Sequence, residues 1–163
     1  MFFLPKKNIL SLGDFRCDDA GLPERTQQLT AWAAPIGTVA VVPTIWRHAC
    51  LDSFNDVIEV LGRHPCVTKV VVVLDLATHE QFLLIKEKVK GAIPEGKQVQ
   101  IIWKNGPNIA RVLELMESHH INTWNTGKGR SCWLALGNEV ALAQNQVISF
   151  FDSDLQHFQE RGP

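Results

Sequence analysis

The stretch Thr68-Lys-Val-Val-Val-Val-Leu-Asp75 is almost wholly apolar and rich in valine until it ends at an aspartate. A strand with one solvated face alternates apolar and polar residues, whereas a continuous apolar run of this length is typical of a strand buried on both faces. Strands are buried in this way in parallel sheets that carry helices on both sides. The stretch therefore predicts a central strand of an α/β sheet.

The flanking sequence repeats the pattern, with short apolar runs that alternate with amphipathic segments. We predict further strands at 38–42, stopped by Pro43, at 99–103 and at 147–151. The predicted helices lie at 48–62, after the capping box at 78–81, at 108–118 and from 130 to about 144. This alternation implies right-handed βαβ units. The expected fold is a Rossmann-like α/β fold, with a mainly parallel sheet and helices on both faces.

Composition excludes several classes of protein. The 163 residues are 45% hydrophobic and 20% charged, with a net charge of -1. This is ordinary globular composition, without the basic excess of a nucleic-acid-binding protein. No apolar run approaches the roughly 18 residues of a membrane span, and the N-terminus lacks the order of a signal peptide. We expect a cytoplasmic protein. The four cysteines form no C-x-x-C pair and are predicted to be free, buried thiols: Cys17, Cys50, Cys66 and Cys132.

Candidate binding residues follow from the predicted sheet, because ligands bind outside the carboxyl ends of parallel strands. The residues at such positions are Pro43, Thr44, Asp75, Asp152, Ser153 and Asp154. A further candidate is the glycine-flanked lysine before the last predicted helix, in the segment Gly127-Lys128-Gly129. Carboxylate oxygens suit Mg²⁺ or Mn²⁺. Glycines let backbone N–H groups approach phosphate oxygens. Together these residues indicate a nucleoside diphosphate site with a divalent metal.

Each residue also has a purely structural interpretation. Asp75 suits a turn or a helix cap, and Asp152 and Asp154 suit the start of a final helix. Lys128 suits a solvated surface. The sequence does not match a P-loop, which would need Gly in place of Asn122 and Ser or Thr in place of Gly129. It also lacks the G-x-S-x-G motif of serine hydrolases.

A strand that ends in Asp152-Ser-Asp154, preceded by Gly127-Lys-Gly129, resembles the GT-A fold glycosyltransferases. Most similar are retaining enzymes of the glucosyl-3-phosphoglycerate synthase and mannosylglycerate synthase type, over about residues 38–155. The resemblance implies transfer of a hexose from UDP-glucose or GDP-mannose to a small acceptor such as glycerate or 3-phosphoglycerate. Ile45-Trp-Arg47 and Leu76-Ala77 depart from the family pattern.

The resemblance also implies roles for the candidate residues. The backbone of Pro43 and Thr44 would contact the nucleoside, and Asp75 would lie near the base. Lys128 would face the base or the diphosphate. Asp152 would approach the ribose or the metal, and Asp154 would coordinate Mg²⁺ or Mn²⁺ bridging the diphosphate.

In those enzymes Asp-x-Asp lies in the middle of the chain, whereas here the sequence ends at Pro163. We therefore expect an N-terminal arm at 1–37 and an incomplete nucleotide-binding domain at 38–163, unable to transfer sugar alone. An unpaired sheet edge would favour a homo-oligomer. The alternatives are a nucleotidyltransferase-like enzyme, a phosphatase that uses Asp-x-Asp, and a non-catalytic nucleotide-binding or scaffold module.

Overall fold

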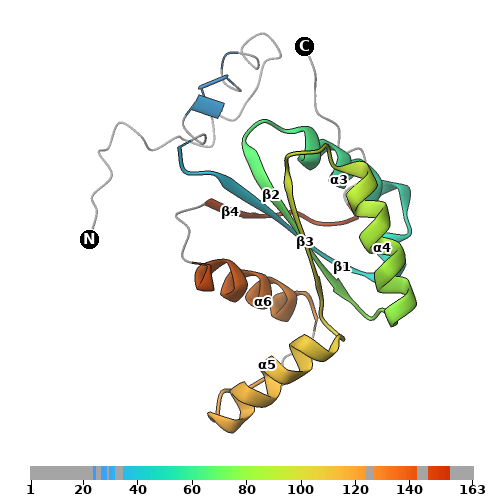
Figure 1. The fold of residues 1–163 in the computed structure, drawn as a ribbon, viewed down its shortest axis with the longest axis vertical. Helices are drawn as coiled ribbons and strands as arrows, with labels where there is room; N and C mark the ends of the chain where they lie inside the picture. Colours follow the sequence, from blue (N-terminus) through green and yellow to red (C-terminus); the bar gives the residue numbers. More distant parts are fainter. Residues whose placement is uncertain are drawn as a thin grey trace, which may run out of the picture.

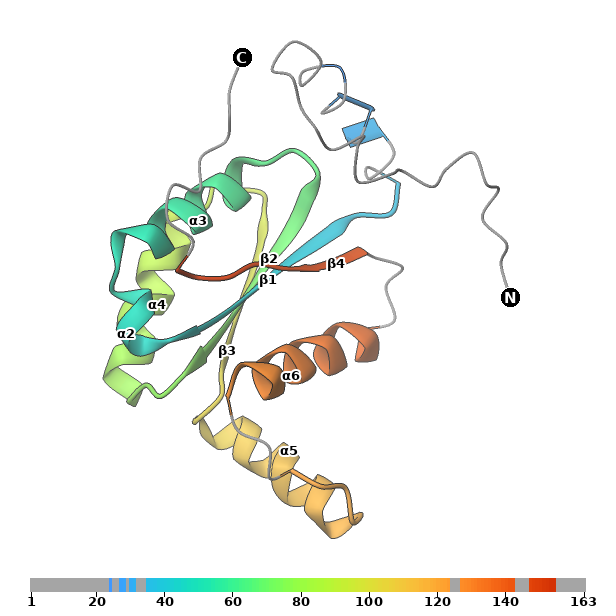
Figure 2. The same cartoon turned by 180° about the vertical axis from the view of Figure 1, so that it is seen from behind.

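The computed structural model of the chain describes residues 24, 27–28, 30–31, 35–123, 127–142 and 147–154. These residues form a four-stranded parallel sheet in the order β3-β2-β1-β4 (Figures 1 and 2). The strands are β1 (Thr38–Ile45), β2 (Val67–Asp75), β3 (Gln98–Trp103) and β4 (Val147–Phe150). The Rossmann-like α/β fold predicted from the sequence is confirmed.

The apolar run of β2 lies in the interior of the sheet, between β1 and β3. Val72 pairs in register with Val42 on one side and with Ile101 on the other. Every residue from Val70 to Leu74 is fully buried. Because side chains alternate along a strand, this run supplies the cores on both faces of the sheet.

Helices cover both faces. On one face lie α3 (Asp52–Arg63) and α4 (His79–Ala92), and on the other lies α6 (Lys128–Ala141) (Figures 1 and 2). Short α2 (Trp46–Ala49) follows β1 directly. In contrast, α5 (Pro107–Ser118) buries none of its residues and projects away from the sheet (Figure 1).

The predicted capping box begins α4. The Thr78 hydroxyl accepts a hydrogen bond from the Gln81 N–H at 3.3 Å, and the Gln81 side chain accepts one from the Thr78 N–H at 2.9 Å. Two backbone N–H groups without helical partners are thereby satisfied at the helix start. The sequence prediction is correct here because the motif is entirely local.

The prediction that Pro43 stops the first strand is wrong, since β1 continues to Ile45 and Pro43 pairs in register with Val73. The Val41 carbonyl accepts a hydrogen bond from the Phe151 N–H at 2.9 Å, so Val41 directs its backbone groups toward β4. The backbone N–H and C=O groups of successive residues in a strand point to opposite sides. Pro43 is two residues after Val41, so the N–H that it lacks would also have pointed toward β4. The register with β4 ends at Val41, and the proline therefore removes no sheet hydrogen bond.

Two predicted helices differ from the observed helices by more than one residue at an end. The segment 48–62 forms α2 and α3 rather than one helix, because Leu51 takes an extended conformation with ψ 154° before α3 begins. The last helix begins at Lys128 rather than at Arg130 and ends at Ala141. Lys128 and Gly129 therefore belong to a helical first turn instead of a loop.

Residues 1–23 of the predicted arm lie outside the described residues, and those described between 24 and 34 are helical. Cys50, Cys66 and Cys132 are free, as predicted, but Cys50 is exposed and the other two are partly exposed. The prediction of buried thiols is thus wrong for these three, and Cys17 is outside the described residues. Among the helices of the described part, none has the length and apolar character to cross a membrane.

Candidate functional site

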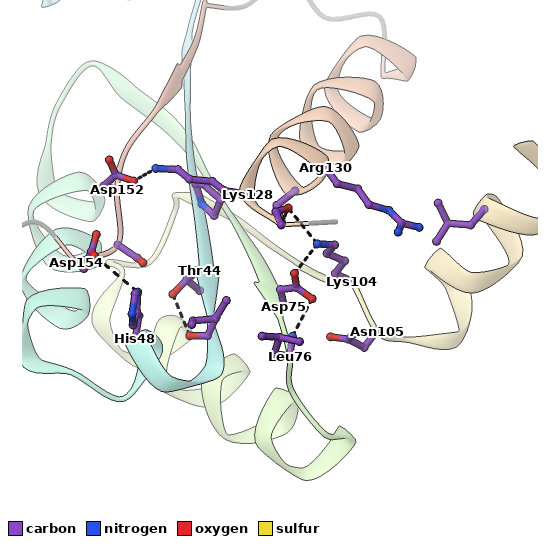
Figure 3. A pocket seen from close by; sticks show the side chains of 16 residues that line it. Thr44, His48, Asp75, Leu76, Lys104, Asn105, Lys128, Arg130, Asp152 and Asp154 are labelled. Atoms are coloured by element: carbon purple, nitrogen blue, oxygen red, sulfur yellow. Dashed lines mark hydrogen bonds and ion pairs between the residues drawn. The ribbon is translucent and has the colours of Figure 1, made fainter. Parts of the chain in front are cut away.

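A pocket of about 790 Å³ opens at the carboxyl ends of the strands (Figure 3). We call it the main pocket. The predicted site residues that line it are Pro43, Thr44, Asp75, Gly127, Lys128, Asp152, Ser153 and Asp154. Parallel strands bring their carboxyl ends to one edge, so residues far apart in the sequence meet there.

Gly129 is the predicted site residue that does not line the main pocket. It lines a neighbouring pocket of about 440 Å³, which we call the second pocket. Because α6 begins at Lys128, successive residues turn by roughly 100° around the helix axis. Lys128 therefore faces the main pocket while Gly129 faces the second.

Asp75 is buried at the end of β2, where it makes two interactions. Its carboxylate accepts a hydrogen bond from the Leu76 N–H at 2.9 Å and is paired with the ammonium of Lys104. The Lys104 side chain is only 6% exposed, and it also donates to the carbonyl of Gly127 at 3.1 Å. Lys104 thus connects the ends of β2 and β3 with the start of α6.

Lys128 and the two later aspartates are more accessible. The side chains of Lys128 and Asp152 form an ion pair and are 55% and 50% exposed. His48 Nδ1 lies 3.8 Å from the Asp154 carboxylate, whose side chain is 53% exposed. Surface ion pairs of this kind contribute little to stability. These groups are therefore able to exchange their present partners for a ligand at little cost.

The N-terminus of α6 also opens on the main pocket, where Gly127, Lys128, Arg130 and Ser131 form part of the wall. Gly127 precedes the helix with φ 90°, a left-handed conformation, and provides no side-chain cap. The first N–H groups of a helix have no carbonyl partner within it, and the helix dipole adds partial positive charge there. The wall is therefore suited to an anion such as phosphate.

Asp152 and Asp154 are the candidate ligands for a metal. Their carboxylate oxygens have the chemistry that Mg²⁺ and Mn²⁺ prefer, and both side chains reach the pocket. The described residues contain no cluster of three or more His, Cys, Asp or Glu side chains placed to hold an ion. The pair fits a metal whose remaining ligands come from water and a bound diphosphate.

Of the charged or ionisable lining residues, the sequence analysis missed His48 and Lys104. Lys104 directly follows β3, so the rule that selected Asp75 would have selected it too. His48 lies on a helix and carries no comparable signal. Its proximity to the strand ends depends on how α2 packs.

The chain was compared with known proteins. Over 156 residues it is 28% identical to glucosyl-3-phosphoglycerate synthase of Persephonella marina. The aligned residues cover 95% of this chain and 37% of that protein. No protein-family model and no solved structure matches the chain. The chain thus spans little more than a third of the length of this relative. Over nearly its whole length, the chain is similar in sequence to glucosyl-3-phosphoglycerate synthase, in agreement with the resemblance in its Gly-Lys-Gly and Asp-Ser-Asp motifs.

Proposed function

We propose that the main pocket binds the nucleoside diphosphate of a sugar donor, as part of a glycosyltransferase that transfers a hexose to a small acceptor. The observation that carries the proposal is the meeting of Lys128, Asp152 and Asp154 in one pocket at the carboxyl end of a parallel sheet. The name of the similar enzyme supports glucose as the hexose and 3-phosphoglycerate as the acceptor. UDP-glucose and GDP-mannose are the donors to test, with glycerate as the second acceptor.

In this proposal the diphosphate lies against the start of α6. Lys128 supplies a charged donor, and the N–H groups of the first turn supply neutral ones. The negative charge that develops on the leaving nucleotide would be stabilised by these groups. Binding of the diphosphate would draw Lys128 away from Asp152, whose carboxylate would then be available to the ribose or to a metal.

The nucleoside would lie near the ends of β1 and β2. Pro43 and Thr44 are buried, so they would contact it chiefly through the backbone. Asp75 would accept a hydrogen bond from the base. The ammonium of Lys104 balances the negative charge of this buried carboxylate. A buried carboxylate without its cation would carry a large desolvation penalty.

A divalent metal would be held by Asp152 and Asp154 together with the diphosphate. When bound, such an ion supplies Lewis-acid stabilisation of the departing phosphate oxygens. Within the described part of the chain, Asp152 and Asp154 are the two carboxylates proposed as ligands, so the binding of the metal and the binding of the nucleotide should each strengthen the other.

Calorimetry tests the proposal directly. The purified chain is titrated with UDP-glucose and with GDP-mannose, each with Mn²⁺ and with a chelator. One donor should bind, and its affinity should fall when the metal is chelated. Absence of binding to both donors under all four conditions would overturn the proposed function. Transfer is tested separately with radiolabelled donor and 3-phosphoglycerate or glycerate.

A further inference from the structure

Among the described residues that line the main pocket, the charged side chains are matched in pairs, with one exception. The pairs are Lys104 with Asp75, Lys128 with Asp152, and His48 with Asp154. Arg130 also lines this pocket, and its guanidinium has no hydrogen-bond or ion-pair partner within the described part of the chain. Its Nε is moreover buried. A buried donor that lacks a partner in the protein indicates a partner that comes from outside it.

Arg130 lies between the two pockets and lines both of them. Figure 3 shows its side chain reaching from the first turn of α6 away from Lys104. The wall of the second pocket includes Leu113 and Met116 of α5 and Trp133 of α6, and Trp133 is half-exposed. The second pocket therefore combines an unmatched cation with an apolar wall.

We propose that Arg130 and the second pocket form an anion subsite, which takes the phosphate or carboxylate of a small molecule. The planar guanidinium binds both groups through two parallel N–H···O bonds. Leu113, Met116 and Trp133 supply a surface for the carbon atoms that carry the anion. The subsite adds one positive charge to those of Lys104 and Lys128, and this added charge is not paired with an aspartate among the described residues.

Two sources of this anion are compatible with the position of Arg130. One is the diphosphate of the donor, which would reach Arg130 from the main pocket. The other is the acid group of an acceptor such as 3-phosphoglycerate, which would lie in the second pocket. The link to sugar transfer rests on the proposed function, whereas the binding of a phosphorylated acid alone does not.

The subsite is tested with three ligands on the full chain: 3-phosphoglycerate, UDP and uridine, each followed by ¹H–¹⁵N NMR titration. The variants are Arg130→Gln, which removes the charge, and Arg130→Lys, which keeps the charge but loses the planar fork. Arg111→Gln is the matched control, because Arg111 is an exposed arginine of α5 that lines neither pocket. Thermal unfolding of each variant verifies that the fold is intact.

Arg130→Gln should raise the Kd of at least one anionic ligand about tenfold or more. The Kd of the same ligand for Arg130→Lys should lie between the values for the wild-type chain and for Arg130→Gln. Arg111→Gln should leave the Kd of each anionic ligand unchanged, and the Arg130 variants should leave uridine binding unchanged. A loss confined to 3-phosphoglycerate assigns the subsite to the acceptor, and a loss confined to UDP assigns it to the donor. The proposal is overturned if Arg130→Gln changes neither, or if the wild-type chain binds neither anion. Binding of 3-phosphoglycerate that depends on Arg130, without any binding of a nucleotide, would reject the proposed function and retain the subsite.

Discussion

Lys104 donates a hydrogen bond to the Asp75 carboxylate inside the protein, joining residues 29 positions apart at the ends of β3 and β2. Both side chains are nearly buried, with 6% and 11% of their surface exposed. The same ammonium holds the carbonyl of Gly127 at the start of α6. The ammonium of Lys104 thus links the end of β3 to the end of β2 and to the start of α6, three segments that line the main pocket.

The first prediction concerns this pair. Lys104→Met should lower the free energy of unfolding by about 3–5 kcal/mol, because it leaves a buried carboxylate without its cation. The double variant Lys104→Met/Asp75→Asn should recover at least half of the loss. Both are measured by urea denaturation. The matched comparison is Lys69→Met, which breaks the buried Lys69–Glu139 pair at the opposite end of β2.

Lys69→Met should also destabilise the fold but leave nucleotide affinity unchanged, since Lys69 is remote from the strand ends that form the pocket. Lys104→Met should reduce both stability and affinity. A loss of less than about 1 kcal/mol in Lys104→Met would show that Asp75 does not depend on the pair.

The second prediction concerns Lys128. Lys128→Ala should weaken binding of UDP by roughly tenfold or more while changing uridine binding little, because a charged hydrogen bond to phosphate is worth about 1.5–3 kcal/mol. The side chain is half-exposed, so stability should change by less than about 0.5 kcal/mol. Calorimetry measures both ligands, with the exposed Lys90→Ala as control. Equal losses for UDP and uridine would mean that Lys128 contacts the nucleoside rather than phosphate.

The third prediction concerns the metal. Asp154→Ala should abolish most of the difference in UDP-glucose affinity between Mn²⁺ and chelator, because one carboxylate alone leaves the ion underligated. Asp56→Ala, an exposed aspartate on α3, should leave that difference intact. Affinity is measured by calorimetry in both conditions. Binding of the wild-type chain that is indifferent to Mn²⁺ would exclude Asp152 and Asp154 as metal ligands.

The fourth prediction separates the two glycines beside Lys128. Gly127→Ala should cost about 1 kcal/mol of stability, since Gly127 has φ 90° and a Cβ is strained there although it would meet no atom within 4 Å. Gly129→Ala should be neutral or stabilising by up to about 1 kcal/mol, because Gly129 is helical and its Cβ would also enter open space. Urea denaturation of both variants checks the order. A larger loss in Gly129→Ala would contradict it.

Much of the fold follows from local features of the sequence. The apolar run that ends at Asp75 is enough to predict a strand buried on both faces, and Thr78 with Gln81 is enough to predict where α4 begins. The placement of Asp75 and Asp152 at strand ends also predicts that they share an edge, because parallel strands align their carboxyl ends. These predictions succeed since strand periodicity, capping and strand direction depend on neighbours in the chain.

The tertiary structure decided what depends on partners distant in the sequence. Pro43 is accepted within β1 because the pairing with β4 has already ended at Val41. Lys104 is buried because Asp75 compensates its charge from another strand. Arg130 borders two pockets because α6 packs on the sheet while its first turn also lies beside α5, which projects from the sheet. Motif and spacing therefore determined which residues reach the end of the sheet. Packing determined which charged side chains are paired there and that the guanidinium of Arg130 is left unpaired among the described residues. The reason is that burial and ion pairing arise only when separate elements meet.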